Sequence, residues 1–213
     1  MRGVYVAGLV GRVAVATLAL GVAGVLAGCD PAATGAGPEV VVTASADTAP
    51  SADPGDNPMT CEMLKNTPVG GKKMDFFGYQ DVIPLVDGRW SGEDGNTVEL
   101  HKPCAIGDLD GDGDGDALGV VSENGGGSGT FFALVAWLDE GGGTPVCVAV
   151  AGLGDRTPVT SIKITNGRAQ VVYLTRADDA PMAVLNIKRT ATYQLIENNE
   201  LAEIGYVDAP YSG

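Results

Sequence analysis

The sequence predicts an all-β domain, a sandwich or partly closed barrel of about eight strands. Two dipeptides typical of tight hairpin turns, Asp87-Gly88 and Asn166-Gly167, each stand between apolar segments. Residues 190–195 alternate between polar and apolar, as a strand with one buried face does. Glycine clusters at residues 125–127 and 141–143 separate the apolar segments in the middle of the chain, which indicates loops.

The elements are expected in the following order. Apart from the N-terminal region, only residues 61–65 have a helical pattern, and this helix is short. Residues 79–86 predict a strand that turns through Asp87-Gly88 into a strand at Arg89 and Trp90. Further strands are expected at residues 97–101, 117–122, 130–138, 146–151, 162–164, 171–174, 184–195 and 201–204. No repeat of fixed period is present, which argues against a propeller or a solenoid.

The N-terminal residues 1–28 have the layout of a signal peptide. Arg2 and Arg12 form the positive region, and an apolar run and small residues follow. An uncleaved transmembrane helix is the alternative, but the uncharged residues 13–28 are fewer than the ~20 that a bilayer requires. The sequence Leu26-Ala27-Gly28-Cys29 resembles the lipobox of bacterial lipoproteins. The resemblance implies cleavage before Cys29, a lipid on its sulfur, and a place on the extracytoplasmic face of the cell membrane.

Two regions follow the predicted anchor. Residues 29–57 are rich in Ala, Pro, Gly and Thr and contain no aromatic residue, so they bury too little apolar surface to fold. We expect them to be a disordered tether. Residues 58–213 have the usual length of one domain and should form a single β-rich unit.

The chain is strongly acidic. It carries 27 acidic and 13 basic residues, and without the two arginines of residues 1–28 the net charge is −16. Nucleic acids require a basic binding face, so this charge argues against them as partners. It suits a soluble secreted domain, a cation as ligand, or a basic partner in the cell envelope or cell wall.

Three cysteines remain if Cys29 carries lipid. An oxidising envelope then allows one disulfide and leaves one thiol over. Cys147 lies in the apolar run 146–150 and should pack as a small hydrophobic residue. We therefore expect a disulfide between Cys61 and Cys104.

The strongest chemical signal is an aspartate loop, residues 108–116. Its acidic members alternate with Leu109 and glycines, so the backbone can curl while carboxylates converge, as Ca²⁺ requires. An EF-hand is excluded because Gly119 stands where a bidentate Glu is needed and because the flanks look extended. The alternative is an acidic, Gly-rich turn that binds no particular ion. Repulsion between close carboxylates favours a bound cation, and we expect a structural Ca²⁺ ion. The candidate ligands are Asp108, Asp110, Asp112, Asp114 and Asp116.

Two resemblances involve this loop. The pattern D-x-D-x-D-G-x-x-D resembles the calcium loops of FG-GAP and integrin-like repeats, which implies side-chain ligands at positions 108, 110, 112 and 116 and a backbone carbonyl from Asp114. Residues 107–113, 123–132, 154–156 and 172–192 together are similar to a module of secreted bacterial proteins and lipoproteins that has no assigned activity.

No catalytic motif is evident. His101 has no obvious Ser or Cys partner in the sequence, and Gly126-Gly127-Ser128-Gly129 departs from the nucleophile elbow at Thr130. Trp137 is expected in the core, whereas Trp90, beside two acids, is the better candidate for a surface contact. We predict a non-enzymatic envelope binding protein. The alternatives are an inhibitor of a basic wall hydrolase of the lysozyme type and a metal-assisted hydrolase that uses the same carboxylates.

Overall fold

The computed structural model describes residues 58–72, 74 and 76–212, all of which belong to one compact unit. The predicted signal peptide, the predicted lipidation site Cys29 and the predicted tether lie outside these residues. None of the helices in the described ranges is long and apolar enough to span a membrane.

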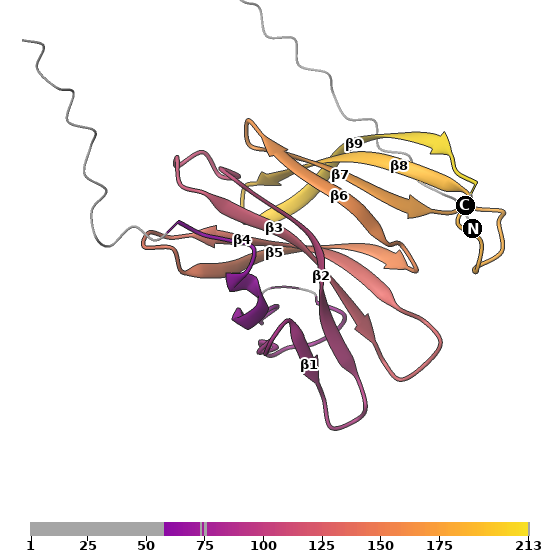
Figure 1. Cartoon of the computed structure of the whole chain (residues 1–213), viewed down its shortest axis with the longest axis horizontal. Coiled ribbons are helices and arrows are strands. Elements are labelled where there is room, and N and C mark those ends of the chain that lie inside the picture. The colour runs from indigo at the N-terminus through magenta and orange to yellow at the C-terminus, as the bar shows by residue number, and fades with distance from the viewer. Residues whose placement is uncertain (1–57, 73, 75, 213) are drawn as a thin grey trace, which may run out of the picture. The chain divides into compact units, whose positions relative to one another are not determined.

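The described chain contains two antiparallel sheets, shown in Figure 1. The strand order is β1-β2-β3-β4-β5 in one sheet and β6-β7-β8-β9 in the other. The sheets are not closed into a barrel. The prediction of an all-β sandwich is therefore confirmed. The elements are η1 (Met63–Asn66), β1 (Arg89–Ser91), β2 (Thr97–Gly107), β3 (Asp116–Asn124), β4 (Phe131–Asp139), β5 (Pro145–Asp155), β6 (Val159–Thr165), β7 (Arg168–Thr175), β8 (Ile187–Ile196) and β9 (Glu200–Pro210).

Tight turns with positive φ precede β1, connect β6 to β7 and connect β8 to β9. Asp87 and Gly88 have φ values of 52° and 79°, and Asn166 and Gly167 have 52° and 70°, as a two-residue hairpin turn requires. Both turns stand where the dipeptides predict them. A three-residue loop joins β8 to β9 and contains Asn198 and Asn199, with φ values of 68° and 57°. Asparagine tolerates this conformation better than other side chains do, because it can hydrogen-bond locally.

The main core lies between the sheets. Leu118, Val120 and Leu134 of the five-stranded sheet belong to the same buried cluster as Val171 and Tyr193 of the four-stranded sheet. The alternation in residues 190–195 matches this arrangement, since Ala191 and Tyr193 are buried and the residues between them are partly exposed. Both sheets therefore contribute one apolar face to the sandwich.

A second core covers the other face of the five-stranded sheet. The segment before β1 supplies Leu64 and Phe76, which belong to the same buried cluster as Val121 and Trp137. The indole N–H of Trp137 donates to the carbonyl of Pro68 at 3.1 Å, which fixes this segment to β4. Strand β3 is buried on both faces as a result, which explains why residues 117–121 within it have no polar side chain. Trp137 is a core residue, as predicted.

Several predicted elements differ from the structure. Residues 79–86 form no strand; they make only isolated bridges, at Tyr79, Ile83 and Val86. Ile83 and Leu85 are buried in the second core, whereas Val82 and Val86 are exposed, so the segment packs on the sheet without forming a strand. The predicted helix is one 3₁₀ turn at Met63–Asn66, and the strand expected from residue 184 begins at Ile187. Strands β2 and β9 extend six residues beyond their predicted ends at 101 and 204.

The structure contains a disulfide between Cys61 and Cys104, whose Cα atoms are 6.0 Å apart. It joins the segment before η1 to β2. Cys147 on β5 is a half-buried free thiol whose Sγ lies 3.6 Å from Sδ of Met74. Burial raises the pKa of Cys147 to about 11, although a hydrogen bond with the backbone of Gly70 opposes the shift.

Candidate metal centre

The aspartate loop connects β2 to β3 at one end of the five-stranded sheet. Leu109 is buried in the main core and anchors the loop from within, while Asp110 and Asp112 are exposed. Gly111 and Gly113 have φ values of 91° and 98°, a region that favours glycine. The alternating glycines thus allow the curl that the sequence predicts.

Side-chain to backbone hydrogen bonds hold the curl. Asp108 Oδ1 accepts from the N–H of Gly111 at 2.6 Å, and Asp110 Oδ1 accepts from the N–H of Asp112 at 3.1 Å. Asp112 Oδ1 accepts from the N–H of Asp114 at 2.8 Å. These contacts keep the aspartate side chains folded back over their own loop, as in Asx turns.

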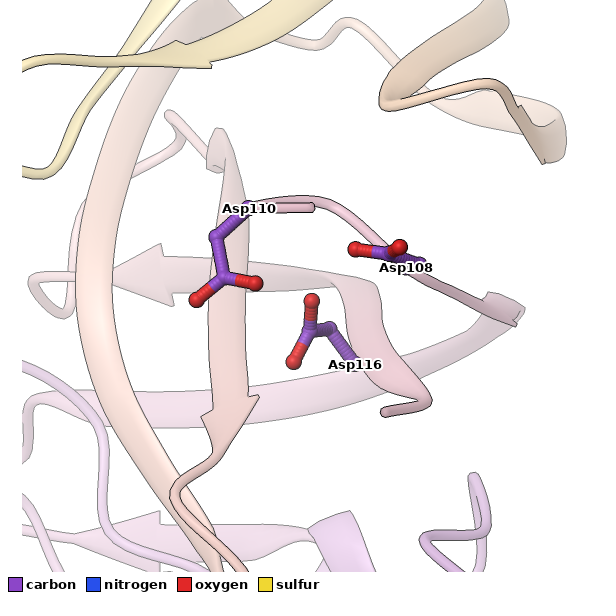
Figure 2. A group of neighbouring side chains, drawn as sticks. All are labelled: Asp108, Asp110 and Asp116. Atoms are coloured by element: carbon purple, nitrogen blue, oxygen red, sulfur yellow. The ribbon is translucent and has the colours of Figure 1, made fainter. Parts of the chain in front are cut away.

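Three carboxylates converge inside the loop. Each of Asp108, Asp110 and Asp116 offers one oxygen, and these oxygens all lie within 4.8 Å of one another. Figure 2 shows Asp108 and Asp110 on the loop with Asp116 between them at the start of β3. Of the five aspartates predicted as ligands, the structure therefore gathers three. Asp112 and Asp114 lie outside this group.

Asp116 is the fixed member of the group because its side chain is fully buried. Its Oδ2 accepts from the N–H of Leu109 at 2.7 Å, and its Oδ1 accepts from the N–H of Asp139 at 3.1 Å. Burial raises the pKa of Asp116, and these two amide donors oppose the shift. The negative charges of Asp110 and Asp112 raise it further.

Sequence reasoning missed the role of Asp139, which ends β4. Its Oδ1 accepts from the N–H groups of Gly141 and Gly143, at 3.0 and 2.9 Å, and so orders the glycine loop before β5. Its own N–H holds Asp116. The hydrogen bond between Asp139 and Asp116 forms because β3 pairs with β4. The two residues are 23 positions apart, so no local pattern in the sequence indicates their contact.

The donor set suits a hard cation. It consists only of oxygens, and three carboxylates crowded within 4.8 Å repel one another unless a positive charge lies between them. Ca²⁺ takes six to eight oxygen ligands in flexible geometry, so backbone carbonyls and water would complete its shell. The three carboxylates present could therefore hold a metal ion.

His101 has a partner that the sequence did not reveal. Its Nε2 lies 2.8 Å from the hydroxyl oxygen of Ser122, on the neighbouring strand β3. Ser122 is only 5% exposed, which leaves its hydroxyl little access to a substrate. Burial lowers the pKa of His101, and Glu99 partly opposes this. The pair resembles a satisfied structural contact more than an activated nucleophile.

No protein-family model, curated protein or solved structure matches this chain.

Proposed function

We propose that the chain is a lipid-anchored, extracytoplasmic binding protein of the cell envelope whose aspartate loop binds a structural Ca²⁺ ion. The convergence of Asp108, Asp110 and Asp116 is the observation that carries this proposal. Asp116 is braced by Leu109 and Asp139, so an ion there would link the β2–β3 loop to the end of β4. The ion would thereby stabilise two loops at once.

The anchor and the absence of catalysis are parts of the same proposal. The lipobox ending at Cys29 supports membrane attachment through lipid. The burial of Ser122 supports a non-enzymatic role, since the His101 pair lacks an accessible nucleophile. Replacing Cys29 with Ala should release the protein from the membrane fraction, and tight retention of that variant would refute the lipid anchor.

The test of the ion is thermal unfolding of the full-length protein in non-ionic detergent, with Ca²⁺, Mg²⁺ or chelator. Extracellular calcium modules have dissociation constants of about 10⁻⁴–10⁻³ M, so ~10 mM Ca²⁺ lies about 10- to 100-fold above them. That excess stabilises the folded state by about 1.4–2.7 kcal/mol. The midpoint should rise by about 3–11 °C. Mg²⁺ should give a smaller rise because it demands stricter octahedral geometry.

Asp110→Asn is the decisive variant. Asp110 is exposed, and asparagine keeps an oxygen that can accept from the N–H of Asp112. The thermal unfolding midpoint of this variant in chelator should therefore stay near that of the native sequence. The rise of its midpoint with Ca²⁺ should disappear. Asp179→Asn is the control, an exposed aspartate outside the loop, and should respond fully. An equal Ca²⁺ response in all three proteins would refute the calcium site.

A further inference from the structure

A cleft of about 320 Å³ lies beside the β1–β2 hairpin, away from the aspartate loop. Residues 79–83 form one side and the hairpin forms the other. Its aromatic wall consists of Tyr79 and Trp90, whose ring centroids are 5.7 Å apart with the planes at 85°. Trp90 packs against the hairpin backbone so closely that a Cβ added to Gly92 would lie 2.6 Å from its ring. The indole is thus held in place before any ligand arrives.

Acidic side chains surround this wall. Asp81, Glu93 and Asp94 line the cleft and are exposed, and no Lys or Arg lines it. Within the described ranges, the four ion pairs of the protein involve other residues. The cleft therefore presents an aromatic surface with three negative charges that no basic side chain of the described chain neutralises.

The Tyr79 hydroxyl is held beside two polar side chains. Its oxygen is buried, with Asn96 and Glu123 as its polar neighbours. Asn96 and Glu123 are near enough to influence its pKa, which burial raises. The buried oxygen and these two neighbours therefore hold the ring of Tyr79 in the wall of the cleft.

We propose that this cleft, lined by Tyr79 and Trp90, binds an organic cation of the alkylammonium or guanidinium type. Tryptophan is the best ring for cation–π contacts, and carboxylates at the rim add attraction for the same charge. A bare divalent ion is disfavoured, because the one convergent group of metal-ligating side chains found in the described residues is in the aspartate loop.

The same chemistry already occurs within the chain. The guanidinium of Arg189 lies 3.7 Å from the ring centroid of Tyr206, and the carboxylate of Asp208 accepts two hydrogen bonds from it at 2.7 and 2.8 Å. The cleft offers the same two components, an aromatic ring and a carboxylate, but lacks the cation. The cation can come from a basic side chain of a polypeptide or from a free amine. The site does not depend on calcium in the aspartate loop.

The experiment is a fluorescence titration of the full-length protein in non-ionic detergent, at low salt and constant Ca²⁺. The chain has two tryptophans, and Trp137 is fully buried, so Trp90 reports on the cleft. The cationic probes are N-acetyl-arginine amide, a short Arg/Lys peptide and spermidine. N-acetyl-citrulline amide is the uncharged control. The cationic probes should change the tryptophan emission in a saturable way, whereas N-acetyl-citrulline amide should leave it unchanged. The Trp90→Phe variant should show no change with any probe.

Charge variants test the carboxylates directly. Glu93→Gln combined with Asp94→Asn should weaken binding by about three- to tenfold, as expected for two exposed charges. Asp179→Asn combined with Glu197→Gln makes the same change in net charge outside the cleft and should stay within about twofold. A peptide that binds tenfold more tightly than the small probes identifies a polypeptide ligand, whereas tighter spermidine binding identifies a free amine. The proposal is overturned by an absence of saturation, by equal binding of citrulline, by a signal that survives in Trp90→Phe, or by equal losses in both charge pairs.

Discussion

Replacing Gly107 with alanine tests how closely the two sheets approach between β2 and β6. A Cβ added at this glycine would lie 2.7 Å from Cγ2 and 2.9 Å from Cβ of Ile164. Atoms in real proteins do not approach so closely, so either the sheets must separate or the isoleucine must move. Ile164 is packed against the main core and is β-branched, which leaves it few alternative rotamers.

The expected effect is that of an overpacked core. Inserting a methyl group into a well-packed site destabilises a protein by about 1–3 kcal/mol. For a domain of this size each kcal/mol lowers the midpoint by about 2–4 °C, so Gly107→Ala should unfold about 2–12 °C earlier than the native sequence.

The assay is thermal unfolding of the full-length protein in non-ionic detergent. Gly152→Ala is the matched control, because Gly152 also lies in a strand, lacks a positive φ, and has no atom within 4 Å of an added Cβ. Its midpoint should be nearly unchanged. In an Ile164→Ala background the penalty of Gly107→Ala should shrink, because the truncated side chain leaves room. The reasoning fails if Gly107→Ala is as stable as the control, or if its penalty is the same in both backgrounds.

Two further predictions concern titratable side chains. Burial lowers the pKa of His101 below its ordinary 6.5, so the unfolded chain binds the proton more readily than the folded one. Stability should therefore decline as the pH falls from about 7 toward 5, and the decline should be shallower in His101→Gln; parallel pH profiles of unfolding would contradict this. Burial raises the pKa of Cys147 to about 11, which keeps its thiol protonated at neutral pH. Mass spectrometry of the peptide that carries Cys147 should show slow alkylation by iodoacetamide in the folded protein and rapid alkylation in urea, and equally rapid alkylation in both would exclude a protected thiol.

Local patterns predicted much of this fold. The turns at Asp87-Gly88 and Asn166-Gly167 follow from the backbone conformations that Asn, Asp and Gly tolerate. The alternation of residues 190–195 predicts which side chains of β8 face the core. Such features depend on residues that are neighbours in the sequence, so composition and spacing are sufficient to indicate them.

Long-range contacts decided the features that the sequence did not show. Residues 79–86 look like a strand, yet only Ile83 and Leu85 are buried in the second core, and the segment makes only isolated bridges. The pairing of His101 with Ser122 requires β2 and β3 to lie side by side. No spacing rule within one segment predicts either arrangement, because each depends on which strands pack together.

The aspartate loop likewise has some features that the sequence shows and others that only the tertiary structure decides. Its acidic residues, its glycines and its place between two strands are properties of the sequence. Which oxygens converge depended on the tertiary structure, because Asp116 is buried and held by the amide of Asp139 on β4. The sequence thus determined which chemistry the loop offers, through the types and spacing of its residues. The packing of β3 beside β4 decided the geometry, because it adds the amide of Asp139 to that of Leu109 in holding the buried carboxylate of Asp116.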